Sequence, residues 1–407
     1  MPRAWFSRTV KDFQRSPGLS LVALLSLFGV IAIQAISTNQ IAGPVWEEVE
    51  YIHMASALGN LSDKAPMAYR LFPAKIVAAL PFDLTFGFQL LNWFFLCLTA
   101  TASVIWLQVM GVNLAQAAAA VALLMATLTI KMTIFWTYGT DSTAWAFEVL
   151  GLITAEAGVI LSTAVLLALG SLAREATALV FVVLAARVLY LQQSTGAWRW
   201  QALLLAFAAL VLLRVGLMLA IPVQGDYSYI DTMVACIQAH FWGKGLIRTA
   251  FLLPLVFGML LWPIILDARG SLQRLRERWD LTLFGLLIML LGLVGGSAID
   301  RLVFAIFPVV LWLFATSART PASALEWCIL AAGQLILMRL WLHIPDPSSG
   351  REFYELLVGF ASLKPLVLRM LLFLVFGFLF GVAQQLRIGR DPSSENPAAP
   401  QSVSQVR

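Results

Sequence analysis

Charged residues are scarce in this chain of 407 residues, since Asp, Glu, Lys and Arg together make up only 12% of it. A soluble domain carries roughly 25% charged residues, and a soluble surface needs polar cover however large its core is. Hydrophobic residues make up 60% of the chain, and the mean hydropathy is +0.85. The shortage of charge excludes an ordinary soluble protein and indicates that lipid surrounds most of the surface.

Cysteine and histidine are also rare, with three residues of each type. Cys97, Cys236 and Cys328 lie in or beside apolar runs without paired spacing, so we expect small buried hydrophobic residues and no disulfide framework or metal motif. Glu50-x-x-His53 has the spacing of metal ligands, but one such pair is a weak signal. The residues identify no metal ligand and no cofactor, while a divalent metal held by carboxylates stays open.

The net charge of +5 and the isoelectric point of about 9.3 do not indicate a nucleic-acid partner. The basic residues are scattered between apolar runs and stand mainly at their ends. That is where the orientation of membrane helices requires them.

Twelve stretches are predominantly apolar, and helices are the only open segments that cross hydrocarbon without orphaned backbone groups. They are residues 18–37, 84–109, 113–131, 142–155, 157–172, 175–191, 200–221, 247–266, 281–298, 302–317, 323–342 and 365–385. The predicted fold is all-α: a polytopic transmembrane helical bundle of about twelve spans over residues 1–387. The Pro/Ser-rich segment 388–407 is predicted to be a disordered cytoplasmic tail.

Residues 142–172 admit two interpretations, because they are either two short spans or one tilted helix over 142–168. Two basic clusters decide between them. They are Arg3, Arg8, Lys11 and Arg15 near the N-terminus, and Arg269, Arg274, Arg276 and Arg278 in one short connection. Two spans place both clusters in the cytoplasm, as the positive-inside rule requires, and one span separates them. We therefore predict two spans here and both chain termini in the cytoplasm.

The longest connections then lie on the non-cytoplasmic side. They are 38–83, 222–246 and 343–364, and they hold all three histidines. Long loops that keep apolar and aromatic residues are usually structured and functional. We therefore expect these outer loops to carry short interfacial helices and the functional site of the protein.

The first outer loop contains Glu47, Glu48 and Glu50 just after the first span. As a helix, it would align Glu47, then Glu50 or Tyr51, then Met54 along one side. A carboxylate in this place can act as a general base, a metal ligand or a counter-charge. The alternative is a solvated acidic rim on an interfacial helix.

Arg70 follows in a stretch interrupted by Pro66, Pro73 and Pro81. The prolines predict two short segments along the membrane interface. An arginine there is suited to bind a phosphate with two hydrogen bonds. Snorkelling to the interface or pairing with a nearby glutamate is an equal alternative.

Ionisable residues also stand at the outer ends of three later spans. They are Asp141, the pair Arg174 and Glu175, and the pair Asp300 and Arg301. Such groups are costly near hydrocarbon and tend to mark function. Sequence neighbours on a helix do not face each other, so each member of a pair must find a partner elsewhere, and a common outer cavity would supply it.

Three more ionisable residues, Glu148, Glu156 and Arg214, fall inside spans or at their inner ends. We interpret them as a structural ion pair and assign them no role.

Together these residues resemble the GT-C superfamily of polytopic membrane glycosyltransferases, including many bacterial relatives. The resemblance covers roughly residues 20 to 310. It rests on short motifs: Glu47-x-x-x-Tyr51-x-x-x-Ala55, Pro66-x-x-Tyr69-Arg70-x-x-Pro73, Thr140-Asp141, Arg174-Glu175-x-Thr177 and a Gly-rich segment ending in Asp300-Arg301. The chain departs from the usual pattern in having Glu-Glu where relatives often have Asp, and in lacking a large domain after the last span.

The resemblance implies a polyprenyl-phosphate sugar donor, a glycan, lipid or protein acceptor, and a catalytic carboxylate in the first outer loop. By position this base is Glu47 or Glu48, and the spacing to Tyr51 favours Glu47. The implied substrate-binding residues are Tyr51, His53, Tyr69, Arg70, Asp141, Arg174, Glu175, Asp300 and Arg301. The cations among them would stabilise the leaving phosphate.

A bacterial resemblance implies the inner (plasma) membrane. Three alternatives stay open from the residues: a transporter or flippase of a lipid-linked substrate, another enzyme acting at the outer face, and an assembly protein. The chain shows no internal repeat, and its polar residues gather at outer span ends instead of at the midplane, which disfavours transport.

Overall fold

The computed structural model describes residues 17–37, 47–62, 64–195, 200–223, 229–241, 249–294, 299–340 and 363–390. These residues form α-helices and short 3-10 helices, and none of them is in a strand. The prediction of an all-α fold is confirmed. The predicted basic N-terminal segment and most of the loop 343–364 lie outside the described residues.

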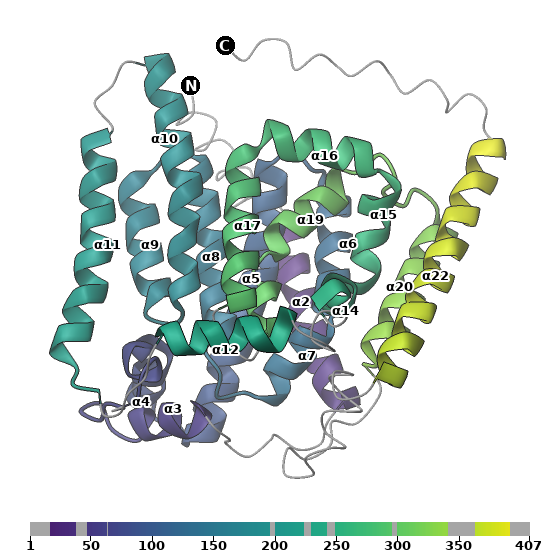
Figure 1. Cartoon of the computed structure of the whole chain (residues 1–407). Coiled ribbons are helices and arrows are strands. Elements are labelled where there is room, and N and C mark those ends of the chain that lie inside the picture. The colour runs from purple at the N-terminus through teal and green to yellow at the C-terminus, as the bar shows by residue number, and fades with distance from the viewer. Residues whose placement is uncertain are drawn as a thin grey trace.

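The helices pack side by side into a bundle (Figure 1). The longer ones are α2 (Pro17–Ser37), α5 (Leu84–Val109), α6 (Leu114–Met125), α8 (Asp141–Glu156), α9 (Ile160–Ser171), α10 (Phe181–Thr195), α11 (Trp200–Ala220), α17 (Trp279–Val294), α19 (Phe307–Thr316), α20 (Ala324–Met338) and α22 (Leu363–Arg390). Shorter helices are α14 (Leu252–Phe257), α15 (Leu261–Leu266) and α18 (Ile299–Phe304). Each of the twelve predicted ranges overlaps one or two of these helices. Helix α22 continues to Arg390, three residues into the range 388–407 predicted as a tail, and the rest of that range lies outside the described residues.

Three helices are long and apolar enough to cross a membrane: Leu84–Val109, Trp200–Ala220 and Leu366–Ile388. The number rises to five if each of two bent pairs is one span, namely α6 with α7 (Leu128–Phe135) and α14–α15 with α16 (Ala268–Glu277). Others are shorter: the 12 residues of α9 extend about 18 Å at 1.5 Å per residue. A hydrocarbon core is about 30 Å thick, so twelve crossings stay a prediction.

Large apolar side chains cover much of the outer surface. On α11, Leu205 is 72% and Leu219 is 83% exposed, and on α22 Phe378 is 70% exposed. Only 6% of the α11 span is buried. A helix that is apolar all round and barely covered by protein fits a lipid environment. The surface is therefore compatible with a membrane protein.

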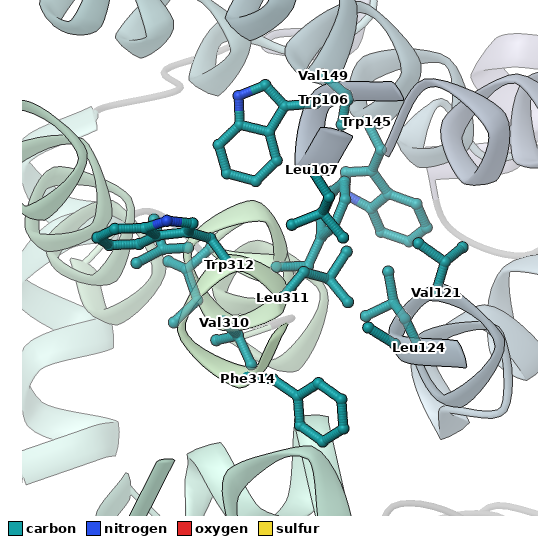
Figure 2. Close-up of a cluster of buried hydrophobic side chains, with 14 of the residues drawn as sticks. Trp106, Leu107, Val121, Leu124, Trp145, Val149, Val310, Leu311, Trp312 and Phe314 are labelled. Atoms are coloured by element: carbon teal, nitrogen blue, oxygen red, sulfur yellow. The ribbon is translucent and has the colours of Figure 1, made fainter. Parts of the chain in front are cut away.

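The centre of the bundle is filled by the short helix α19. Figure 2 shows Leu311 of α19 against Leu107 of α5, Trp145 of α8 and Leu124 of α6. These four side chains are at most 1% exposed. A short helix buried on all sides packs as core, so α19 holds its neighbours together instead of facing lipid.

Residues 142–172 form two helices, as predicted. Helix α8 ends at Glu156, and α9 begins at Ile160 and packs back against it. Gly158 between them has φ +64°, a left-handed conformation in which a Cβ atom is strained. The sharp reversal at Gly158 excludes a single tilted helix.

Short helices cover one end of the bundle, here named the α3 end. They are α3 (Glu47–Ala55), η1 (Met67–Tyr69), α4 (Leu71–Ala79) and η2 (Glu175–Val180), and α12 (Tyr229–Phe241) crosses nearby (Figure 1). This confirms short helices in the predicted outer loops 38–83 and 222–246. At the opposite end, named the α16 end, residues 268–277 form a helix where a plain connection was predicted.

The cysteine prediction holds in part. Cys236 is buried and Cys97 is half-buried, whereas Cys328 is exposed on α20. The expectation of burial for Cys328 was therefore wrong. A small apolar residue can occupy an exposed position where lipid surrounds the protein in place of water.

Candidate functional site

Helix α3 buries most of its acidic residues. Glu48 is 4% and Glu50 is 8% exposed, beside the fully buried Tyr51 and Met54. The alternative of a solvated acidic rim is therefore wrong for these two carboxylates. Glu47 begins α3, but its side chain lies outside the described residues.

Glu50 is held in place by the chain that follows α3. It accepts hydrogen bonds from Lys64 Nζ at 2.5 Å and from Ser62 Oγ at 2.9 Å. The bond from Lys64 lowers the pKa of the Glu50 carboxyl, and it outweighs the opposing effect of partial burial. Glu50 therefore anchors the loop after α3 as a carboxylate.

Lys75 of α4 fastens the far end of α3. Its Nζ donates to the carbonyl oxygens of Met54 at 3.2 Å, Ala57 at 3.4 Å and Asn60. A cation at a helix C-terminus satisfies carbonyls that have no partner within the helix. His53 lies nearby but is exposed, so the structure does not bring it into the ion pairs below.

The prolines delimit the two predicted segments. Pro66 precedes η1, Pro73 lies in the first turn of α4, and Pro81 follows its extended C-cap. Tyr69 ends η1 and Arg70 connects it to α4, and the two residues are only 5% and 9% exposed. Arg70 is therefore turned into the protein and does not snorkel.

Arg70 joins α3 to η2. Its Nη1 donates to Tyr51 Oη at 3.3 Å, and its Nη2 donates to Glu175 Oε2 at 3.1 Å. Glu175 also pairs with Arg214 of α11, whose guanidinium stacks over the Tyr69 ring at 5.3 Å. Of snorkelling and pairing with a glutamate, the structure shows the pairing, with Glu175. Phosphate binding by Arg70 stays a prediction.

Two guanidinium groups compete for the Glu175 carboxylate. Glu175 pairs with Arg70 through Oε2 and with Arg214 through Oε1. Each carboxylate oxygen thus holds one arginine.

Asp141, the first residue of α8, is the centre of a second group. It pairs with Arg174 and, at 3.4 Å, with Nη1 of Arg301 on α18. The Arg301 guanidinium also lies 5.6 Å from the centre of the Trp136 ring. A carboxylate is favoured at a helix N-terminus, where the backbone N–H groups carry partial positive charge. The side chain of Asp300 lies outside the described residues.

The two groups are linked because Arg174 and Glu175 are consecutive. Arg174 is extended, with φ −151° and ψ 138°, just before η2. Successive side chains of extended backbone point in opposite directions, so each residue has its own partners, as predicted. The linked set, here named the α3-end ion cluster, comprises Arg70, Asp141, Arg174, Glu175, Arg214 and Arg301.

The interpretation of Glu148, Glu156 and Arg214 as a structural ion pair is wrong. Arg214 belongs to the α3-end ion cluster, and Glu156 lies at the other end of α8. Glu148 lies in the middle of α8 and is 1% exposed. Its Oε1 has no hydrogen-bond partner among the described residues. The signal for Arg214 was present, since an arginine inside an apolar run is costly unless it is paired.

A second buried ion network lies at the α16 end. Glu156 pairs with Arg187 at 2.8 Å and with Arg278, and Asp280 pairs with Arg278 at 2.9 Å. Each carboxylate side chain is at most 8% exposed. We name Glu156, Arg187, Arg278 and Asp280 the α16-end ion cluster.

In the described part of the chain, no three His, Cys, Asp or Glu side chains are close enough to bind one metal ion together. Comparisons with protein-family models, curated proteins and solved structures found no match for this chain. The site must therefore be interpreted from its own chemistry.

Proposed function

We propose that this chain is a polytopic glycosyltransferase of the bacterial inner membrane. It moves a sugar from a polyprenyl-phosphate carrier to an acceptor at the periplasmic face. In this proposal the chain crosses the membrane twelve times, both termini are cytoplasmic, and the α3 end faces the periplasm.

The observation that carries the proposal is the composition of the α3-end ion cluster. Among the described residues, its ion pairs gather four arginines around the carboxylates of Asp141 and Glu175. The ion-paired residues Asp141 and Arg301 are 160 positions apart in sequence. A cationic group at the outer end of apolar helices suits an anionic phosphate whose lipid tail stays in the bilayer. Arg70, Arg174 and Arg301 would stabilise charge on that leaving phosphate.

The reaction needs a base for the acceptor. A carboxylate takes the proton of the acceptor hydroxyl as its oxygen attacks the anomeric carbon. The bond from that carbon to the phosphate oxygen breaks, and the polyprenyl phosphate leaves with the electron pair. Attack opposite the leaving group inverts the configuration. Glu47 and Glu48 are the candidate bases, and the burial of Glu48 beside Tyr51 supports a carboxylate held inside the site.

The experiment is transfer of radiolabelled sugar from polyprenyl-phosphate donors by the purified full chain, with Glu47→Gln and Glu48→Gln beside the wild type. Glu277→Gln is the matched control, because Glu277 is exposed at the opposite end. Transfer that is lost in one loop variant and kept in the control identifies the base. Absence of transfer and donor hydrolysis across a broad donor panel overturns the proposal.

One observation favours a second candidate, a transporter or flippase. Glu148 is a buried carboxyl inside α8, and such residues often lie on ion or proton paths. Transport of a lipid-linked substrate in vesicles that Glu148→Gln abolishes, without any sugar transfer, would favour this candidate.

A further inference from the structure

Helix α16 is oriented differently from the neighbouring helices at the α16 end. It bends by 97° from the apolar segment α14–α15 and runs across the α16 end of the bundle (Figure 1). If α14–α15 lies along the membrane normal, α16 lies along the membrane surface. Its sequence is rich in arginine, with four arginines in residues 268–278.

Two of these arginines are directed into the protein. Arg274 donates to Asp267 Oδ2 at 2.8 Å, and Arg278 pairs with Asp280 at 2.9 Å. Ser271 of α16 is also buried, and its Oγ donates to the Ile264 carbonyl oxygen at 3.3 Å. The rotation of α16 about its own axis is therefore fixed by its inner face.

The other two arginines are exposed. Arg269, Leu272 and Arg276 follow at spacings of three and four, which places them on one face of the helix. Leu272 is 51% exposed, and Trp279 just beyond the helix is 57% exposed. An exposed apolar residue between two exposed cations is typical of a helix lying in a membrane interface.

The apolar character continues onto the neighbouring helix. Ile265 and Leu266 at the end of α15 are 47% and 39% exposed. The opposite charge nearby is Glu277, which is exposed and accepts a hydrogen bond from Gln273 on the adjoining face. The surface with Arg269, Leu272 and Arg276 is thus cationic and continuous with the lipid-facing side of α15.

We propose that this face of α16 binds the headgroups of anionic phospholipids. Each guanidinium can donate two hydrogen bonds to a phosphate, while Leu272 and Trp279 enter the interface below it. A soluble acidic partner would leave the apolar residues between the arginines and α15 in contact with water, so the bilayer is the better fit. The inference is independent of sugar transfer, since α16 lies at the end opposite the α3-end ion cluster.

The test places a photo-crosslinking amino acid at position 272 of the full chain. The protein is reconstituted in nanodiscs with equal amounts of phosphatidylglycerol and phosphatidylcholine, and the adducts are identified by mass. We expect phosphatidylglycerol adducts to dominate. Because each basic residue at a membrane surface favours an anionic lipid by about fivefold, Arg269→Gln with Arg276→Gln should bring the ratio close to one. The matched control, Arg269→Lys with Arg276→Lys, should keep most of the preference.

Three results would overturn the proposal. They are an equal ratio without the Gln substitutions, a ratio that the Gln substitutions leave unchanged, and adducts to a co-purified protein instead of lipid. Equal thermal unfolding of the Gln and Lys variants confirms that folding does not cause the difference, because neither exposed arginine contributes to the inner face of α16.

Discussion

Each end of the bundle holds a buried ion network, and the two networks are built differently. At the α16 end, two carboxylates meet two arginines, and the formal charges cancel (2 − 2). The residues come from α8, α10, the C-terminus of α16 and the start of α17, and α10 packs against both α8 and α17. At the α3 end, four arginines surround two carboxylates, and additional short helices bring Arg70 and Glu175 into place.

The difference separates a structural network from a candidate site. A balanced buried network satisfies its own charges and needs nothing more. Several arginines gathered at one end of apolar helices are costly there and suited to bind an anion, and such groups tend to mark function. The exposed arginines of α16 show a third arrangement, since they face outward from the protein.

The largest effect is expected from a substitution that breaks the α16-end ion cluster. Asp280→Asn leaves Arg278 buried with one carboxylate fewer, and breaking a buried pair costs about 3–5 kcal/mol. We expect the free energy of unfolding of the purified chain in detergent to fall by this amount, while sugar transfer per folded molecule is unchanged. Glu277→Gln, three residues away and exposed, should change the unfolding free energy by less than about 0.5 kcal/mol. A loss of transfer in folded Asp280→Asn protein would contradict a purely structural role.

The next effect concerns the α3 end. Arg70→Gln removes a guanidinium that would stabilise the leaving phosphate, and we expect sugar transfer to fall about 100-fold in kcat. The matched variant is Arg187→Gln, which removes an arginine from the other network. It should lower the unfolding temperature and leave kcat of the remaining folded enzyme unchanged. Equal losses of kcat in both variants would erase the distinction between the two ends.

A smaller effect depends on pH and on Glu50. Its pKa is lowered in the folded protein from the ordinary value of 4.5, so the folded state binds this proton less readily than the unfolded state. The stabilisation is complete above about pH 4.5 and is lost as the pH falls through the lowered pKa. Unfolding curves from pH 7 to 3 should therefore show a decline that is shallower in Glu50→Gln. Lys64→Gln should flatten the curve similarly, because the Lys64 hydrogen bond is the main cause of the shift, and an unchanged curve would exclude that cause.

The smallest effect tests the turn between α8 and α9. Gly158→Ala forces a Cβ atom into a left-handed conformation, which costs about 1 kcal/mol. The turn follows Glu156 directly, so we expect a modest drop in the unfolding temperature and unchanged sugar transfer. A stabilised variant would mean that the turn is not left-handed in the membrane.

Much of the fold could be predicted from the sequence because hydropathy is a local property. Each apolar range overlaps helices, and α5 begins and ends at the predicted residues 84 and 109. The short helices α3 and α4 were predicted from their acidic pattern and their prolines. The helix over 268–277 was missed, because a charged segment between two apolar runs resembles a plain connection until its inner face is seen to pack.

The candidate site was predicted in its members but not in its pairing. Asp141 and Arg174 were singled out because ionisable residues at span ends are costly, and Arg70 because it stands in a proline-interrupted stretch at the interface. Arg214 was dismissed, since its position along an apolar run gave no sign of which end it would reach. The acidic residues of α3 were left between two interpretations, because burial of one helix face depends on what packs against it.

The sequence by itself determined that this protein is helical, that lipid can surround it and which residues are costly enough to require partners. These properties follow from composition and from the spacing of residues close together in the chain. The tertiary structure decided which charges meet, as with Arg70 and Glu175, which are 105 positions apart. Such contacts depend on how whole helices pack, and helix packing is set by side-chain shape across many residues, which no local pattern encodes.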